Sequence, residues 1–201
     1  ESSETTHLSV LDDQGNAVSL TTTLNATFGS GIMVQGAGFL LNNELDDFSI
    51  LAGTPNMFGL VGSEANQLRP GRRPLSSMTP SVVREAGGRV VLVLGAPGGP
   101  RIISSVLQVV LRVLVYRQDL NSAIAAPRLH QQWRPLETRV EKTFDPGLLG
   151  ALAENHGQPF APGSAAGLVQ AIWVEEDGQP TAESDPRSGG SGGIQAPKLP
   201  R

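Results

Sequence analysis

Apolar and polar residues alternate in two stretches near the start of the chain, at residues 5–11 and 17–23, which are rich in Thr and Val. The segment between them, Asp-Asp-Gln-Gly-Asn, consists of typical turn formers. This pattern predicts a β-hairpin. A second hairpin is predicted at residues 81–84 and 89–94, where two Val-rich runs flank a Gly-Gly turn.

The strongest helical signal covers residues 101–117, where apolar residues occupy most of the helix circumference. Such a helix is expected to be buried on more than one side. A short helix is expected at 121–126, and Pro146 and Gly157 bracket a further helix over residues 147–156. The other strands are expected at 39–41, as a short buried strand, and at 128–133, 138–144 and 168–175.

Two long stretches, residues 25–38 and 42–77, follow neither period. Irregular segments of this length inside a domain usually carry function or are disordered. From residue 189 onward Gly, Ser and Pro dominate, which predicts a disordered tail over 189–201. Hairpins and helices together predict a layered α+β domain. The helix at 101–117 needs a partner on its second side, and the rest of the chain offers few candidates.

Composition narrows the function more than the fold. The 201 residues include no Cys, so disulfides, thiol catalysis and cysteine metal sites are excluded. The net charge of −4 argues against nucleic-acid binding, and no apolar run approaches the length of a membrane span. The first residues contain neither Met nor a signal peptide. We therefore expect a segment or a processed piece of a longer protein.

Without Cys, the candidate nucleophiles are Ser and Thr hydroxyls that have a base nearby. Thr5 and Thr6 open the first predicted strand, and His7 is one candidate base. The α-amino group of a Thr freed by cleavage is another, because its pKa of about 7.7–8.0 suits proton transfer near neutrality. Ordinary strand residues would also explain these hydroxyls, and composition alone favours that interpretation.

Three further segments carry candidate chemistry, each with a plainer alternative. Residues 95–99, Gly-Ala-Pro-Gly-Gly, join a strand to the apolar helix, whose first N–H groups suit an oxyanion, although a tight turn explains them too. The acidic residues 42–47 suit an ammonium group better than a metal, or they form a solvated loop. Arg72 and Arg73, with the serines at 76–77, are weak evidence for a carboxylate site. The isolated histidines, His130 and His156, are interpreted as structural or surface residues.

Each segment alone is a weak signal, but the order and spacing of seven motifs along the chain are more specific. The motifs are Thr-Thr-His-Leu-Ser-Val at 5–10, Gly-Asn-Ala-Val-Ser at 15–19, Thr-Leu-Asn at 23–25, Leu-Leu-Asn-Asn-Glu-Leu-Asp-Asp-Phe-Ser at 40–49, Pro-Leu-Ser-Ser-Met-Thr-Pro at 74–80, Gly-Ala-Pro-Gly-Gly at 95–99 and Ser-Asp-Pro-Arg at 184–187. In order and spacing they resemble the small catalytic subunit of the γ-glutamyltranspeptidases. The resemblance covers roughly residues 1–188.

This resemblance implies an N-terminal nucleophile hydrolase, an α+β fold with a four-layer αββα sandwich completed by a large subunit. The family is made as a precursor that cuts itself, here between Glu4 and Thr5. Residues 1–4 would then end the large subunit or the propeptide side, and residues 5–188 would form the small subunit. Cleavage leaves Thr5 with a free α-amino group as its base, in agreement with the chemistry argued from the residues.

The resemblance also assigns roles by motif. Thr5 would be the nucleophile and Thr23 the hydroxyl that positions it. The remaining assignments are Asn25, Glu44 and Asp47 for the α-amino group of the γ-glutamyl donor, Ser76 and Ser77 for its α-carboxylate, the backbone N–H groups of Gly98 and Gly99 for the oxyanion, and Phe58 for the lid. A zwitterionic γ-glutamyl compound needs acidic groups at its ammonium end and hydrogen-bond donors at its carboxylate end, so these residue types are chemically consistent with the assigned roles.

The implied reaction transfers a γ-glutamyl group from glutathione or a similar donor to Thr5, and then to water or to an amino-acid or peptide acceptor. It needs no metal and no organic cofactor. The implied partner is the large subunit, which carries the Arg that binds the donor carboxylate. The implied location is periplasmic or extracellular, and neither nucleic acid nor a membrane span is expected.

Two departures and two alternatives accompany the resemblance. Four residues precede Thr5, so its nitrogen lies in an amide in this chain, and Phe58 stands where bacterial members often carry a lid Tyr that bonds to Asn25. The alternatives are a cephalosporin-type acylase on the same scaffold and a non-catalytic family member. The carboxylate of Asp47 favours an amine-bearing donor, and the presence of Thr5 and Thr23 argues against a non-catalytic role.

Overall fold

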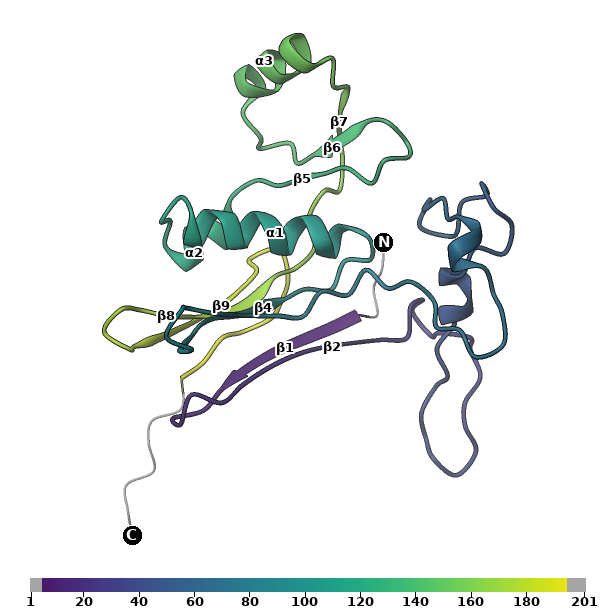
Figure 1. Cartoon of the computed structure of the whole chain (residues 1–201), viewed down its shortest axis with the longest axis horizontal. Coiled ribbons are helices and arrows are strands. Elements are labelled where there is room, and N and C mark those ends of the chain that lie inside the picture. Colours follow the sequence, from purple (N-terminus) through teal and green to yellow (C-terminus); the bar gives the residue numbers. More distant parts are fainter. Residues whose placement is uncertain (1–4, 195–201) are drawn as a thin grey trace.

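The computed structural model describes residues 5–194, which fold into two β layers covered on one side by a helix (Figure 1). The first layer is the predicted hairpin. Strands β1 (Thr5–Leu11) and β2 (Ala17–Thr23) pair antiparallel along their whole length, with Thr5 opposite Thr23. Asp12 closes the turn, because its carboxylate accepts from the backbone N–H groups of Gln14 and Asn16 at 2.9 and 2.8 Å.

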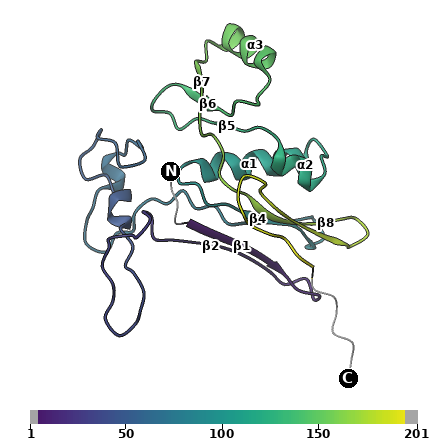
Figure 2. The same cartoon turned by 180° about the vertical axis from the view of Figure 1, so that it is seen from behind.

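The second layer is a four-stranded antiparallel sheet in the order β3-β4-β8-β9. Its strands are β3 (Ser81–Arg84), β4 (Val90–Gly95), β8 (Gln170–Val174) and β9 (Pro180–Ser184). Strand β4 is buried at every residue because the hairpin packs on one face of the sheet and α1 (Arg101–Leu114) covers the other. Figures 1 and 2, seen from opposite sides, show this layering.

Helix α1 has an inner and an outer apolar stripe. The inner residues Ile102, Val106, Val109 and Val113 join the core with Leu92 and Leu94 of β4. The outer residues are Ile103, Leu107, Leu111 and Val115, which are 39–61% exposed. The helix is therefore apolar on two sides, but the described residues bury only one of them, so the expected burial on more than one side is not seen within this part of the chain. It ends at Leu114, three residues earlier than predicted.

A smaller unit lies beyond α1 (Figure 1). It contains a three-stranded sheet of β5 (Leu129–His130), β6 (Thr138–Val140) and β7 (Phe160–Pro162), whereas α2 (Leu120–Ala125) lies beside the end of α1 and joins the main core. Helix α3 (Pro146–His156) begins at the side-chain cap of Asp145 and ends at Gly157, whose φ is +63°, as the Pro–Gly bracket predicted.

A buried charge network holds this unit to the end of β9. Arg128 and Asp185 are both fully buried and lie 2.9 Å apart. Arg187 adds ion pairs with Glu141 at 2.7 Å and with Asp185 at 3.1 Å. Buried charges are tolerated only when they are paired in this way, so the network fixes how the chain end packs.

Several predicted boundaries were wrong. Residues 39–41 form no buried strand, because Leu40 makes only an isolated bridge with Met33, and Phe39 and Leu41 are 55% and 42% exposed. The strands expected at 128–133 and 138–144 are two and three residues long, and β7 and β9 were not predicted.

Residues 24–80 leave the layered body as an excursion (dark blue in Figure 1). Its only helical pieces are the short 3-10 turns η1 (Glu44–Asp47) and η2 (Glu64–Asn66), in agreement with the irregular stretch predicted there. Residues 189–194 of the predicted tail have no regular structure, and residues 195–201 lie outside the described part of the chain. Within the described residues no helix is long and apolar enough to cross a bilayer.

Candidate active site

Thr5 and Thr23 face each other at the open end of the hairpin. Their register brings the two side-chain oxygens to 2.9 Å. The Thr23 oxygen also accepts from the backbone N–H of Asn25 at 2.9 Å, which leaves the Thr23 hydrogen available for Thr5. Asn25 itself is buried and adopts a φ of +73°, so the chain turns sharply just after Thr23. Hairpin pairing alone therefore places a second hydroxyl against the candidate nucleophile.

His7 is engaged elsewhere and is not placed as the base for Thr5. Its Nδ1 lies 2.7 Å from the Thr21 hydroxyl and its Nε2 lies 3.1 Å from the Ser9 hydroxyl. Burial lowers the pKa of His7 to about 4, so the ring is neutral at physiological pH. The ring fills the space above Gly95, where an added Cβ would lie 2.2 Å from the His7 Cε1. His7 thus fits strand β1 against β4.

A small hollow beside Thr5 collects residues that lie far apart in the sequence. It is lined by Thr5, Thr23, Asn25, Glu44, Asp47, Phe58, Leu60, Ser76, Ser77, Met78, Gly99, Pro100 and Ile102. The predicted nucleophile, amine-binding, carboxylate-binding and lid residues all line it, and so does Gly99 of the predicted oxyanion pair, whereas Gly98 is buried and does not. Leu60, Met78, Pro100 and Ile102 were not predicted, because apolar residues carry no chemical motif. Glu4, on the other side of the predicted cleavage point, lies outside the described residues.

Glu44 and Asp47 form a carboxylate pair in the turn η1. Burial, reinforced by the adjacent Asp47, raises the pKa of Glu44 to about 8. Burial also raises the pKa of Asp47, although the hydrogen bond from Glu44 lowers it. Two carboxyl groups this close share a proton near neutrality. The pair therefore presents about one negative charge to the hollow, which suits a single ammonium group.

The glycine loop after β4 is held close to the backbone of another segment. Gly98 and Gly99 have φ values of +147° and +58°, and an added Cβ on Gly98 would lie 2.7 Å from the Cα of Gly167. Leu168 N–H donates to the carbonyl of Pro97 at 2.9 Å, which supports the loop from behind. Gly99 reaches the hollow at the start of α1, where the positive end of the helix dipole favours developing negative charge.

The serines line the hollow and the neighbouring arginines do not. The Ser76 hydroxyl accepts from Met78 N–H at 3.2 Å, and Ser77 is half-buried. Arg72 and Arg73 are exposed and are not among the lining residues. This geometry gives the two arginines no role in the site. Within the described residues no group of three His, Asp or Glu side chains is placed to hold a metal ion.

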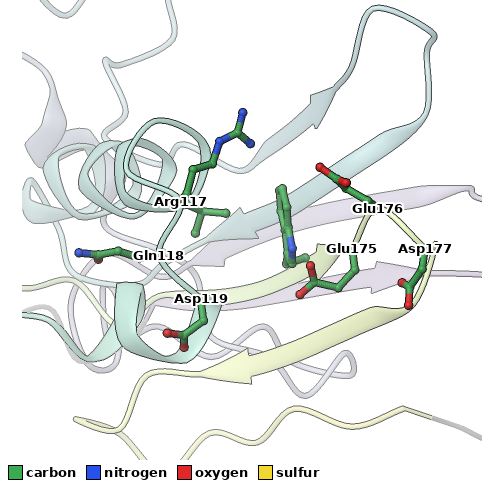
Figure 3. Close-up of a pocket in the computed structure, with 8 residues that line it drawn as sticks. Arg117, Gln118, Asp119, Glu175, Glu176 and Asp177 are labelled. Carbon is green, nitrogen blue, oxygen red and sulfur yellow. The ribbon is translucent and has the colours of Figure 1, made fainter.

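A larger hollow of about 660 Å³ lies at the other end of α1 (Figure 3). Acidic side chains dominate it, with Asp119 on one side and Glu175, Glu176 and Asp177 on the β8–β9 turn. Arg117, whose φ is +56°, points over it. No Ser or Thr hydroxyl lines this hollow, so it offers no nucleophile for the chemistry expected at Thr5.

Comparisons with known proteins agree with the motifs. The family model for gamma-glutamyltranspeptidase matches residues 1–194. The glutathione hydrolase proenzyme of Escherichia coli K12 is 51% identical over 188 residues, which is 94% of this chain and 32% of that protein. A solved γ-glutamyltranspeptidase mutant of Helicobacter pylori has a TM-score of 0.84 at 46% identity, covering 91% of this chain and 100% of the solved one. The chain thus spans about a third of the length of this relative and of two related glutathione hydrolase proenzymes from Pseudomonas.

A cephalosporin acylase from Bacillus halodurans also shares the fold. Its TM-score is 0.80 at 24% identity, covering 95% of this chain and 34% of that one. Identity this low shows a common fold and carries no argument about substrate.

Proposed function

The chain belongs to the γ-glutamyltranspeptidase family, and we propose that it is the catalytic small subunit of an enzyme that transfers γ-glutamyl groups through Thr5. Its α+β fold is that of the N-terminal nucleophile hydrolases, as predicted. The observation that carries the proposal is the Thr5–Thr23 hydroxyl pair, 2.9 Å apart, in a hollow lined by a carboxylate pair, two serines and the glycine loop.

The proposed cycle begins once the bond before Thr5 is cut. The freed α-amino group takes the proton from the Thr5 hydroxyl, whose oxygen bonds to the γ-carbonyl carbon of the donor. The Gly98–Gly99 loop stabilises the oxyanion, which is typically worth a factor of about 10²–10³ in rate. The amide C–N bond then breaks, and the α-ammonium group returns the proton to the leaving amine. Water or an acceptor amine completes the cycle, and glutathione fits as a donor.

In the proposed recognition, the acidic pair meets the ammonium group of the γ-glutamyl compound, and neutral hydroxyl groups meet its carboxylate. The Glu44–Asp47 pair and Asn25 meet the donor ammonium, while the Ser76 and Ser77 hydroxyls donate to its carboxylate. An acylase donor without an α-amino group would leave the acidic pair unmatched, which favours a γ-glutamyl donor over a cephalosporin side chain. The proposed cycle requires no metal or organic cofactor.

The remaining part of a longer precursor is the proposed partner. Leu8, Val10, Val18 and Leu20 lie on the outer face of the hairpin and are 43–53% exposed. A sheet face of this kind needs a covering layer, and the family's four-layer sandwich has one that the described residues do not supply. We assign this layer to the large subunit, with cleavage between Glu4 and Thr5. A periplasmic or extracellular location is proposed on the resemblance alone.

The test uses the full precursor and a chromogenic γ-glutamyl anilide. Thr5→Ala should stay uncut and inactive. Thr6→Ala is the matched control, because Thr6 is exposed on the other face of β1, and it should be cut and active. N-terminal sequencing of the mature small chain should give Thr5 as its first residue. A different first residue, or activity in Thr5→Ala, would overturn the assignment of the nucleophile.

A further inference from the structure

The segment at residues 55–61, here called the lid segment, is a compact turn over the hollow. Pro55 and Val61 form a bridge at its base. The Asn56 side-chain oxygen accepts from the N–H groups of Phe58 and Leu60, both at 3.0 Å. These bonds make the segment one unit, so Phe58 and Leu60, which both line the hollow, move together.

The hollow under the lid segment is too small for a γ-glutamyl group. The space inside it that is open to the centre of a water-sized sphere is about 30 Å³, which holds only about two or three waters. Enclosing a whole γ-glutamyl group therefore requires lining residues to move, and Phe58 and Leu60 are the lining residues on the lid segment. Whatever holds the lid segment down controls how readily the hollow opens and how firmly a bound donor is covered.

On the side facing the nucleophile, the contacts of the lid segment are weak or exposed. Asn25 and Asn43 direct their side-chain amides at the sulfur of Met57, at 4.0 and 3.9 Å, and thioether sulfur is a weak acceptor. The N–H of Met57 donates to Asp46 at 3.2 Å, on the exposed side of the excursion. Neither contact fixes Phe58 itself.

On the opposite side, a residue from the segment between β5 and β6 reaches the backbone of Phe58. The side-chain N–H of Gln132 donates to the Phe58 carbonyl at 3.3 Å. Gly59 lies directly beneath the same amide, since an added Cβ would be 3.6 Å from its nitrogen. This bond therefore joins the lid segment to a part of the fold more than 70 residues away in sequence.

The Gln132 amide is held in the donating orientation by two further side chains. Its oxygen lies 2.9 Å from Nε2 of the buried His130, and Nδ1 of His130 lies 2.8 Å from the Ser104 hydroxyl on α1. An amide oxygen can only accept, so Nε2 must carry the hydrogen, and the NH₂ group of Gln132 faces Phe58. Because Nε2 donates in both charge states of His130, the orientation does not depend on the protonation of the ring.

We propose that Gln132 is a positioning residue that latches the lid segment closed over the γ-glutamyl hollow, braced by His130 and Ser104. The inference rests on the proposed function for its substrate and on these three hydrogen bonds for its geometry. Gln132 is not itself among the residues that line the hollow, and it reaches the hollow only through the backbone of Phe58. Its loss should therefore weaken the covering of a bound donor without removing a chemical group from the reaction.

Two variants of the full precursor test the latch. Gln132→Ala removes the side-chain N–H that donates to the Phe58 carbonyl. Gln132→Glu keeps the size and an acceptor for His130 but turns a carboxylate oxygen toward the Phe58 carbonyl. Each should raise the KM for a γ-glutamyl anilide about threefold to tenfold, the usual scale for losing one hydrogen bond, while kcat does not fall. Gln158→Ala is the control, because its amide also donates to a backbone carbonyl, that of Leu136 at 3.0 Å, at an exposed position away from the lid segment.

A second readout does not depend on activity. Chymotrypsin cleavage after Phe58, followed by mass spectrometry at matched thermal stability, should be several-fold faster in both Gln132 variants than in the control. Unchanged cleavage and unchanged KM would overturn the latch, as would a kcat that falls in step with stability. If the unmodified enzyme shows no γ-glutamyl activity, the proposed function fails, whereas the cleavage rates still decide whether Gln132 holds the lid segment.

Discussion

Replacing Glu44 and Asp47 separately should have unequal effects, although both carboxyls line the same hollow. With its pKa raised to about 8, Glu44 is only about one-tenth ionised at pH 7. Glu44 is then neutral and donates to Asp47, whose carboxylate carries the charge. Gln is neutral and has nearly the same shape as a protonated Glu. Glu44→Gln should therefore be mild at pH 6–7, whereas Asp47→Asn removes the charge that meets the donor ammonium.

The magnitudes follow from this assignment. Losing one partner of a desolvated charge pair costs about 2–5 kcal/mol, which corresponds to a loss of roughly 30-fold to several-thousand-fold in kcat/KM for Asp47→Asn. Glu44→Gln should stay within about threefold at pH 7. Between pH 7 and 9 Glu44 ionises, so the ratio of unmodified to Glu44→Gln kcat/KM should change by up to about tenfold. The α-amino group of the γ-glutamyl anilide titrates equally in the two assays, so its effect cancels in this ratio.

Stability gives an independent check on the same proton. Because the folded pKa of Glu44 is raised, its contribution to stability is fully present below the ordinary value of 4.5 and is lost as the pH rises toward 8. Glu44→Gln should flatten the fall in Tm over that window.

The kinetic assays are initial rates with a γ-glutamyl anilide and with an analogue lacking the α-amino group. Glu44→Gln as damaging as Asp47→Asn at pH 7, or equal losses on both donors, would refute the charge assignment.

Three further outcomes are expected. Gly95→Ala should displace the His7 ring, because the added Cβ would lie 2.2 Å from it, and should lower both Tm and kcat. The expected loss of stability is about 1–3 kcal/mol. Gly87→Ala, in an exposed turn, is the control for thermal melting. Asp185→Asn leaves Arg128 buried without its charge partner and should cost about 3–5 kcal/mol in urea unfolding. Residues 1–201 expressed alone should associate, bind a hydrophobic dye and melt broadly, and co-expression with the rest of the precursor should restore a sharp transition; a sharply melting monomer without dye binding would contradict this.

Local patterns predicted the elements whose causes are local. The hairpin was predictable because its alternation and its turn residues lie within 19 consecutive positions. Helix α3 was predictable because Pro146 and Gly157 mark both of its ends. Strand β7 was missed because Phe-Ala-Pro is too short to show a period, and β9 was missed because Pro-Thr-Ala-Glu-Ser has no large apolar residue. Their extended form depends on β6 and β8, the strands with which they pair.

The site was predictable where a side chain carries the chemistry. Thr5, Asp47 and Ser76 have motifs, and the structure brings them to one hollow. Gln132 could not be predicted in this way, because its acceptor is the Phe58 carbonyl, a backbone group that every residue possesses. Arg128 was missed for a related reason, since its burial depends on Asp185, 57 residues later in the chain.

The error at residues 39–41 has the same origin as the exposed face of the hairpin. An apolar run predicts burial only if some part of the molecule covers it, and the sequence does not say which part. In the hairpin, the face packed on β4 carries His7, Ser9 and Ser19, whereas Leu8, Val10 and Leu20 point outward. The polar face lies inward because the His7 ring fills the space above Gly95, and the Ser19 hydroxyl bonds to Leu94 at 2.8 Å. The polar hairpin face therefore packs Thr5 into place beside the glycine loop, and the apolar face is the surface that we propose the rest of the precursor covers.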